Sequence, residues 1–219
     1  MTFSLLARDP ESGAIGGAAA TGNLCVGAWV LRGKAGVGMS ASQGHFPSTL
    51  WGETVLDEMA KGATPTQAVH DVVTPDQGRE ARQLLALDQT GQAGVFSGKE
   101  NVPTVSELVK PGIGAAGNML SDASVIKALV SGYETQQGSF LRKLLAGLVA
   151  GAEAGGDARG LMSAAILILS ENHPPIDLRV DLSDDPLGAL SDLVRRVEGR
   201  EYAQWMQALP TTSDPYPCH

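Results

Sequence analysis

Most glycines in this sequence lie inside short apolar runs and not in polar linkers. The chain has 27 glycines, while aromatic residues make up only 5% of it. A residue without a side chain lets two backbone layers approach each other closely. Glycines inside apolar runs are therefore typical of stacked sheets and tightly packed helices, and they argue against a chain that is rich in linkers.

Length and composition set the size of the fold. The chain has 219 residues, of which 43% are hydrophobic and 18% are charged. A chain of this length forms one domain or at most two small ones, and these proportions supply a sizeable core. We expect one main domain over residues 1–198, followed by a C-terminal helix and a loose tail over residues 199–219.

Charge and hydropathy exclude two classes of partner. Aspartate and glutamate number 24 against 16 lysines and arginines, which gives a net charge of −8 and a pI of about 4.9. Contacts to nucleic-acid phosphates need clustered lysine and arginine, so we expect no nucleic-acid partner. The chain also lacks an apolar run of the roughly eighteen residues that a membrane span needs, so we expect no membrane partner.

The first residues and the cysteines indicate the compartment. The segment MTFSLLARDP lacks the basic start and the long apolar stretch of a signal peptide. Two cysteines, Cys25 and Cys218, do not make a disulfide framework. We therefore expect a cytoplasmic protein. The sequence leaves open whether the chain forms a homo-oligomer.

Short apolar runs bounded by turn residues predict the strands. The segment Asp9-Pro10-Glu11-Ser12-Gly13 has proline and glycine in suitable places for a turn. The run over 162–169 is the strongest of the strand signals, and 176–181 follows it as the second strand of a hairpin. The predicted strands are 3–7, 14–20, 24–30, 35–42, 83–88, 92–97, 162–169 and 176–181.

Apolar side chains at a spacing of 3.6 residues predict the helices. Pro65 suits a first helical position, and Asp185 with Pro186 predicts another helix start. Residues 98–112 show no such period and are expected to be irregular. The predicted helices cover 48–61, a segment that starts at 64, two segments around 125–133 and 140–149, a segment that starts at 185, and a last one around 202–209.

The order of these elements predicts the fold class. Blocks of strands alternate with pairs of helices, and strands joined by tight turns are antiparallel. We expect an α+β protein with a four-layer αββα sandwich, in which two stacked, mainly antiparallel sheets lie between helix layers.

Motifs for cofactors and metals are weak. The segment Gly112-Ile113-Gly114-Ala115-Ala116-Gly117 fits the G-x-G-x-x-G pattern of dinucleotide sites, but no clear strand precedes it. We interpret it as a close-packed turn at the start of a helix, and a dinucleotide-binding enzyme is a weaker alternative. The four histidines are scattered, without metal-ligand spacing. We therefore expect no cofactor and no metal.

Thr2 can be read in two ways. If Met1 is removed, Thr2 carries a hydroxyl and a free α-amine on the same residue, and an amine with a pKa of about 7.7–8.0 can act as base for that hydroxyl. However, threonine is common in second place, so the residue alone does not establish a nucleophile.

A family resemblance adds to this reading. The blocks TFSLLARDPESGAIGGAAAT, GVGMSASQG, DQGREARQ, AAGNML, AGGDARGLMSAA and PPIDLRVD occur in this order from Thr2 to about Leu193. They resemble the bacterial domain of unknown function 1028 family, which is placed with the N-terminal-nucleophile hydrolases. That placement implies the same αββα sandwich, while the activity and the substrate of the family are not established.

The resemblance implies roles for five residues. Thr2 would be the nucleophile, Gln43 and Gly44 would supply oxyanion donors together with Asn118, and Asp157 would orient the N-terminus. The implied function is hydrolysis of an amide bond in a small molecule or peptide by an N-terminal threonine. Taken singly, Asn118 could instead cap a helix and Asp157 a glycine turn.

The sequence departs from the proteasome-like members of that superfamily. Thr21 stands where those members use an aspartate, and only Arg32 or Lys34 lies near the position of their lysine. The alternative is therefore a non-catalytic protein that keeps the fold and binds a small molecule or serves as a scaffold. Hydrolysis by Thr2 is the leading expectation.

Overall fold

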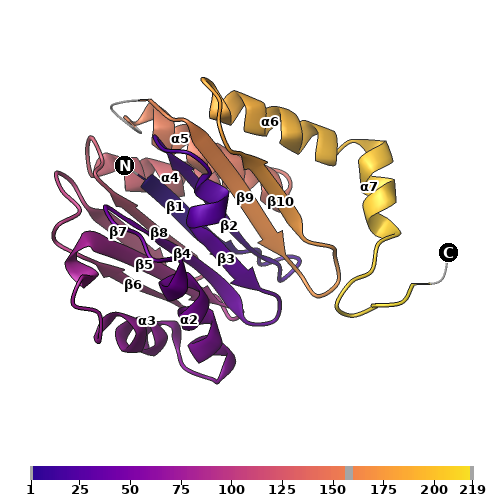
Figure 1. The fold of residues 1–219 in the computed structure, drawn as a ribbon. Helices are drawn as coiled ribbons and strands as arrows, with labels where there is room; N and C mark the ends of the chain where they lie inside the picture. The colour runs from indigo at the N-terminus through magenta and orange to yellow at the C-terminus, as the bar shows by residue number, and fades with distance from the viewer. Residues whose placement is uncertain (1, 156–159, 218–219) are drawn as a thin grey trace.

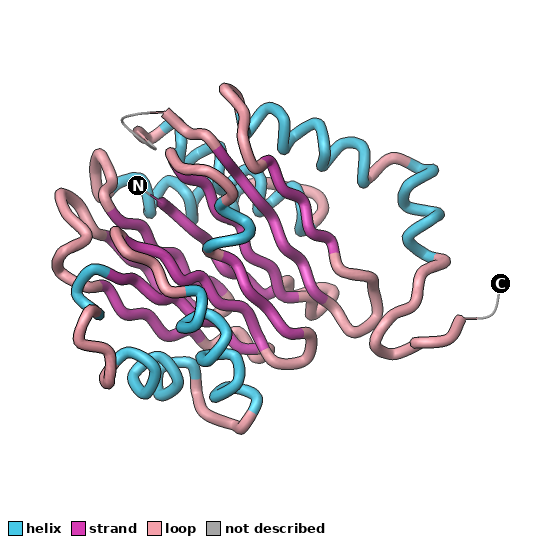
Figure 2. Tube along the Cα trace, viewed as in Figure 1, coloured by secondary structure: helices cyan, strands magenta, loops and turns pink. Residues whose placement is uncertain are grey.

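Two antiparallel sheets lie face to face, and helices cover the outer side of each sheet (Figure 1). The computed structural model describes residues 2–155 and 160–217. Figure 2 shows the strands in the middle of the molecule and helices on both sides of them. The expected four-layer αββα sandwich, the arrangement of N-terminal-nucleophile hydrolases, is thereby confirmed.

The larger sheet has six strands in the order β10-β9-β2-β1-β8-β7. Each neighbouring pair in it is antiparallel, and the expected hairpin of β9 and β10 is present. Its strands are β1 (Thr2–Arg8), β2 (Ile15–Thr21), β7 (Ser106–Lys110), β8 (Ile113–Asn118), β9 (Ser163–Leu169) and β10 (Ile176–Val180). The first strand of the chain therefore lies in the interior of this sheet, between β2 and β8.

The smaller sheet has four strands in the order β3-β4-β5-β6, and all three pairings are antiparallel. Its strands are β3 (Leu31–Lys34), β4 (Gly38–Gly44), β5 (Arg82–Asp88) and β6 (Ala93–Ser97). The short 3-10 helix η1 (Arg79–Ala81) leads into β5. Strands β4 and β5 lie in the middle of this sheet and face the larger one.

The helices are amphipathic and turn their apolar sides to the sheets. Side-chain oxygens of Ser48, Thr64, Ser139 and Asp185 accept backbone hydrogen bonds at the starts of α2, α3, α5 and α6. None of the helices in the described part of the chain has the length and apolar character to cross a membrane. The helices are α1 (Val26–Trp29), α2 (Thr49–Ala60), α3 (Pro65–Val73), α4 (Ser124–Thr135), α5 (Phe140–Glu153), α6 (Pro186–Val197) and α7 (Arg200–Gln207).

The two sheets approach each other around Leu6. This side chain is fully buried between the sheets, and its partners in the strand register on either side are Gly17 and Gly114. A Cβ atom at Gly114 would lie 2.9 Å from Leu85 Cδ1 of the opposite sheet. The glycines on either side of Leu6 therefore leave room for leucine side chains of the opposite sheet. This close approach of the two sheets is what the glycines inside apolar runs predict.

The strand prediction for residues 24–30 is wrong. Residues Val26–Trp29 form the single-turn helix α1, and the strand β3 begins only at Leu31. The turn is held from outside, because Ser163 Oγ accepts a hydrogen bond from the Val26 amide (3.1 Å). A Cβ atom at Gly27 would lie 2.9 Å from Ala165 Cβ, so this helix packs tightly on β9. Tertiary contacts have overridden the local strand propensity.

The prediction for residues 98–117 is also wrong in two places. The segment expected to be irregular contains β7, an edge strand with glutamate and lysine that lacks an apolar pattern. The glycine motif that we interpreted as a turn before a helix forms β8, an interior strand with every residue buried. Because the motif is a strand and does not open a helix, the structure gives no support to the dinucleotide alternative.

The close approach at Gly114 can be tested by a double-mutant cycle. We expect Gly114→Ala to lower the free energy of unfolding by about 1–3 kcal/mol, because the added methyl group overlaps Leu85. In a Leu85→Ala background the same change should cost less than about 1 kcal/mol, since the overlapping atoms are gone. Urea unfolding of the four proteins measures both values, and equal costs in the two backgrounds would contradict the proposed contact.

Candidate functional site

Thr2 begins the central strand of the larger sheet. It pairs with Thr21 of β2 on one side and with Asn118 of β8 on the other. The side chain is largely buried, with 8% of the residue exposed. Its Oγ1 lies 3.0 Å from Thr21 Oγ1, so the two hydroxyls share a hydrogen bond. The strand register therefore fixes both the backbone and the hydroxyl of Thr2.

Polar side chains form a row across this end of the sheet. Residues directly opposite each other on paired strands project from the same face. Thr21 is also paired with Ser163 of β9, so the row runs from Ser163 through Thr21 and Thr2 to Asn118. The same face carries Leu6 farther along β1, and it is the face that meets the smaller sheet. The row thus lies at one end of the layer between the sheets.

Three side-chain amides continue this row into the smaller sheet. Gln83 Nε2 donates to the Gly117 carbonyl (3.2 Å), so its Oε1 accepts from Gln43 Nε2 (2.7 Å) and from Asn118 Nδ2 (3.1 Å). Gln43 Nε2 also donates to the Ala116 carbonyl (3.1 Å). A carbonyl oxygen can only accept a hydrogen bond. Exchanging the amide oxygen and nitrogen of Gln43 or Gln83 would therefore place its side-chain oxygen against a backbone carbonyl oxygen. The backbone of β8 therefore fixes the direction of the network.

The network leaves acceptors unsatisfied. The atoms Gln43 Oε1, Asn118 Oδ1 and Ser4 Oγ are buried and have no hydrogen-bond partner among the described residues. Each of these residues is at most 1% exposed. An unsatisfied buried polar atom costs about 1–3 kcal/mol, so groups of this kind call for a partner. The two amide oxygens require an N–H or O–H donor, such as that of water or of a substrate.

Asn101 joins the loops behind the site. It is fully buried, and its Oδ1 accepts from the His45 amide (2.9 Å) while its backbone carbonyl accepts from the Met119 amide (3.1 Å). Its Nδ2 donates to the carbonyls of Arg82 and Gly98, each at 3.0 Å. Asn101 thus ties the end of β4, through its side chain, to the end of β8, through its backbone carbonyl, next to Gly44 and Asn118.

Gly44 is required where β4 leaves the sheet. Its φ of 137° lies in the region that favours glycine. A Cβ atom there would also lie 2.6 Å from the Ala81 carbonyl oxygen. A side chain would therefore push the end of β4 away from the residues before β5 and would disturb the position of Gln43.

The site is built from neutral side chains, and one acid reaches its edge. Gln83 Nε2 donates to Ser97 Oγ (2.8 Å), and Ser97 Oγ donates to Glu107 (2.5 Å). The two basic residues near the expected lysine position do not contact Thr2. Arg32 forms an ion pair with Glu53 (3.4 Å), and Lys34 is exposed at the end of β3.

The acidic strand β10 is separate from the site. Loss of hydration raises the pKa of Asp177, which is separated from Thr2 by the strands β9 and β2. Its neighbour Arg179 lies 3.4 Å from Asp181 in an exposed ion pair. Exposed pairs of this kind contribute little stability, so this alternating segment is a solvated face.

The structure brings together some of the residues that the sequence singled out. Thr2 and Asn118 are adjacent, and Asn118 and Gln43 bind the same oxygen of Gln83. Asp157 lies outside the described residues, so its place relative to Thr2 stays a prediction. Among the described residues, no group of three or more histidine, cysteine, aspartate or glutamate side chains could hold a metal ion.

Four members of the site were missed by the sequence reasoning, namely Ser4, Gln83, Asn101 and Ser163. Two of them carried a usable signal. Ser4 follows Thr2 at the strand period of two, and Gln83 is an uncharged polar residue beside a buried apolar run. Asn101 and Ser163 act through contacts with distant segments, which no local pattern could indicate.

The role of Asn101 can be tested at the level of single amides. We expect Asn101→Ala to lower the free energy of unfolding by about 2 kcal/mol or more, because it removes three buried hydrogen bonds. Hydrogen exchange should become faster at the His45 amide, because this amide donates to the Asn101 side chain that the substitution removes. The Met119 amide, which binds the backbone of residue 101, is the internal control and should change less. Equal loss of protection at both amides would contradict a specific role for the side chain.

Comparisons with known proteins agree with the family resemblance. The model of a family of unknown function, DUF1028, matches residues 2–190. A crystal structure of a DUF1028 protein from Silicibacter pomeroyi has 48% sequence identity and a TM-score of 0.94, over 98% of this chain and 93% of that chain. A search of curated proteins finds no match.

Two other solved structures are far more distant. Eukaryotic HslV from Trypanosoma brucei has 12% identity and a TM-score of 0.47, over 76% of this chain and 98% of that chain. Anbu, an ancestral beta-subunit from Yersinia bercovieri, has 10% identity and a TM-score of 0.41, over 95% and 98%. The family model and the Silicibacter structure decide the assignment: the chain belongs to the DUF1028 family, a family of unknown function.

Proposed function

We propose that the protein hydrolyses an amide bond of a small molecule or peptide, with the Thr2 hydroxyl as the nucleophile. One observation carries the proposal. The hydroxyl of the second residue lies at the end of the layer between the sheets, hydrogen-bonded to Thr21 and next to a network of buried amides. A surface threonine with no further role would not be expected to have such surroundings.

The base in this mechanism is the α-amine of Thr2, which becomes free when Met1 is removed. The amine takes the hydroxyl proton while Oγ1 bonds to the substrate carbonyl carbon. The tetrahedral intermediate then breaks its C–N bond, and the leaving amine takes the proton from the α-ammonium group. Water next attacks the ester and gives a proton to the α-amine. The C–O bond to Thr2 breaks, and the proton returns to Oγ1.

Donors for the oxyanion come from the other side of the site. Gln43 Nε2 already donates to two acceptors, whereas Asn118 Nδ2 donates to Gln83 Oε1 and has a second hydrogen to offer. We assign the side-chain donor to Asn118 and backbone donors to Gln43 and Gly44. One donor to an oxyanion is worth about 2.7–4 kcal/mol of the barrier. Asp157 keeps its proposed role of orienting the α-amine on the strength of the family resemblance.

The unsatisfied acceptors fit the same substrate class. An amide or peptide carries N–H groups as well as a carbonyl, and Gln43 Oε1 and Asn118 Oδ1 are free to accept them. All side chains in the row and in the amide network are neutral at pH 7. A neutral substrate group therefore suits the site better than a charged one, since a buried charge needs a paired opposite charge.

The nucleophile can be tested without knowing the substrate. A β-lactone acylates an activated hydroxyl by ring opening, and the adduct stays on the protein as added mass. We expect a chain that begins at Thr2 to gain one lactone mass at residue 2. Thr2→Ala should abolish this acylation, and Thr2→Ser should keep its rate within about tenfold, because serine lacks only the methyl group. Intact-mass and peptide-mass measurements give both results.

Two controls separate chemistry from folding. Ser40→Ala removes a buried hydroxyl of β4 that donates to the Gly52 carbonyl of α2 (2.7 Å), outside the site, and should leave acylation unchanged. A form that keeps Met1 should react at least about tenfold more slowly, because its Thr2 nitrogen is an amide without basicity. Full acylation of Thr2→Ala, or an equal rate with Met1 retained, would overturn the proposal and favour a non-catalytic protein that keeps the fold.

A further inference from the structure

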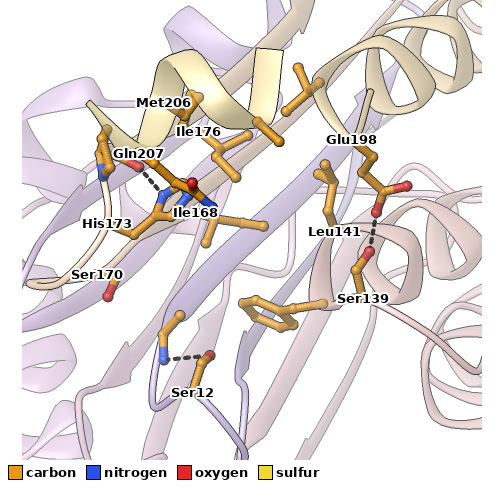
Figure 3. Close-up of a pocket in the computed structure, with 15 residues that line it drawn as sticks. Ser12, Ser139, Leu141, Ile168, Ser170, His173, Ile176, Glu198, Met206 and Gln207 are labelled. Atoms are coloured by element: carbon orange, nitrogen blue, oxygen red, sulfur yellow. Dashed lines mark hydrogen bonds between the residues drawn. The ribbon is translucent and has the colours of Figure 1, made fainter. Parts of the chain in front are cut away.

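A cavity of about 380 Å³ lies under the C-terminal helix α7. Figure 3 shows Met206 of α7 above Ile168 and Ile176 of the hairpin β9–β10, with Leu141 of α5 on the other side. Phe140 and Val197 also belong to the apolar part of the lining. The cavity is thus bounded by a sheet edge, by the start of α5 and by the last two helices.

The cavity is separate from the Thr2 site. Ile168 and Ser163 lie on the same strand, five residues apart, and residues separated by an odd number project from opposite faces. At about 3.3 Å per residue the two positions are roughly 16 Å apart. Ile168 belongs to the core on the helix side of the sheet, and Ser163 faces the layer between the sheets. The cavity therefore has no part in the proposed hydrolysis.

The helix α7 closes the cavity incompletely. Met206 is the one buried residue of this helix, while Tyr202 and Trp205 are exposed. The chain beyond the helix is tied back, because the Ser213 amide donates to the Glu171 carbonyl (2.9 Å). The helix is therefore held over the hairpin at both ends while the apolar space beneath it stays unfilled.

The size of this space decides which class of occupant fits. Pockets for small molecules span about 300–1,000 Å³ and are mostly apolar. The volume therefore fits a small organic molecule.

The polar groups around the cavity indicate an uncharged ligand. Glu198 lies in the lining and binds Arg142 (2.6 Å) and Ser139. His173 Nδ1 is hydrogen-bonded to the Pro174 carbonyl (2.6 Å). None of the lining residues is a lysine or an arginine. An anionic head group would therefore face a carboxylate without a cation of its own, which disfavours fatty acids.

We propose that this cavity binds an uncharged amphiphile, with an alkyl chain or single ring between Met206, Ile168 and Leu141. The hydrogen-bonding head lies beside Gln207 at the end of α7, an exposed residue whose side-chain amide can both donate and accept. Burial of the apolar tail supplies the affinity. The cavity is a binding site in its own right, and it stands whether or not Thr2 is a nucleophile.

Octan-1-ol is the probe that tests this site in the full chain. With methionine methyl groups labelled with ¹³C, we expect a saturable NMR shift of the Met206 methyl group. Met59, in the separate core between α2 and α3, is the internal control and should not shift. Octanoate has the same chain length with an anionic head, and we expect it to bind at least about tenfold more weakly.

Matched substitutions on α7 locate the binding. Ala203 lines the cavity, so Ala203→Phe should fill it and weaken octan-1-ol binding at least about tenfold. Gln204→Phe places the same ring on the exposed side of the helix and should bind octan-1-ol like the parent. If thermal unfolding shows that Ala203→Phe is not folded, the smaller Ala203→Leu replaces it, and it should also weaken octan-1-ol binding.

Three outcomes would overturn the proposal. The first is a Met206 methyl group that does not shift up to the solubility limit of octan-1-ol. The second is octanoate that binds as tightly as the alcohol, which would contradict the uncharged head group. The third is a Met206 shift that depends on protein concentration without ligand and accompanies dimerisation in sedimentation, which would assign the cavity to a second copy of the chain.

Discussion

The contact of Leu6 with the opposite sheet is the constraint on which the sandwich depends. Leu6 lies between Gly17 and Gly114 in the strand register, so the leucine projects into a space that its two neighbours leave empty. Side chains of the other sheet, such as Leu31 and Leu85, fill the positions that Cβ atoms at these glycines would need. Close packing of this kind is sensitive to a single added methyl group. The spacing of the sheets along β1 follows from it, including the spacing at Thr2.

At the end of this layer the packing changes from apolar to polar. Ser4 and Thr2 precede Leu6 on the same face of β1, at intervals of two residues. The amides of Gln43 and Gln83 enter from the other sheet and bind the backbone of β8. A buried polar network is stable only when its members are satisfied, and this one leaves acceptors open. That imbalance is what distinguishes a candidate site from a structural network.

The Thr2 site and the cavity under α7 lie on opposite faces of the larger sheet. The inner face offers hydroxyls and amides at the start of β1, which suits bond cleavage at a neutral amide. The outer face offers an apolar space under α7, which suits a ligand held by burial of its tail. The family model ends at residue 190, before α7, so the cavity includes a segment beyond the matched region.

The sequence by itself determined the layer order, because buried runs such as 162–169 and the helix starts at Pro65 and Pro186 are local signals. It also indicated Thr2, through the family resemblance. Only the tertiary structure decided that 26–29 is a helical turn, since the hydrogen bond that the Val26 amide donates to Ser163 Oγ holds it. The same holds for the Gly112–Gly117 motif, which becomes a strand because its neighbours β1 and β7 pair with it. Local patterns record periodicity and turns, whereas pairing and hydrogen bonds between distant residues exist only in the folded chain.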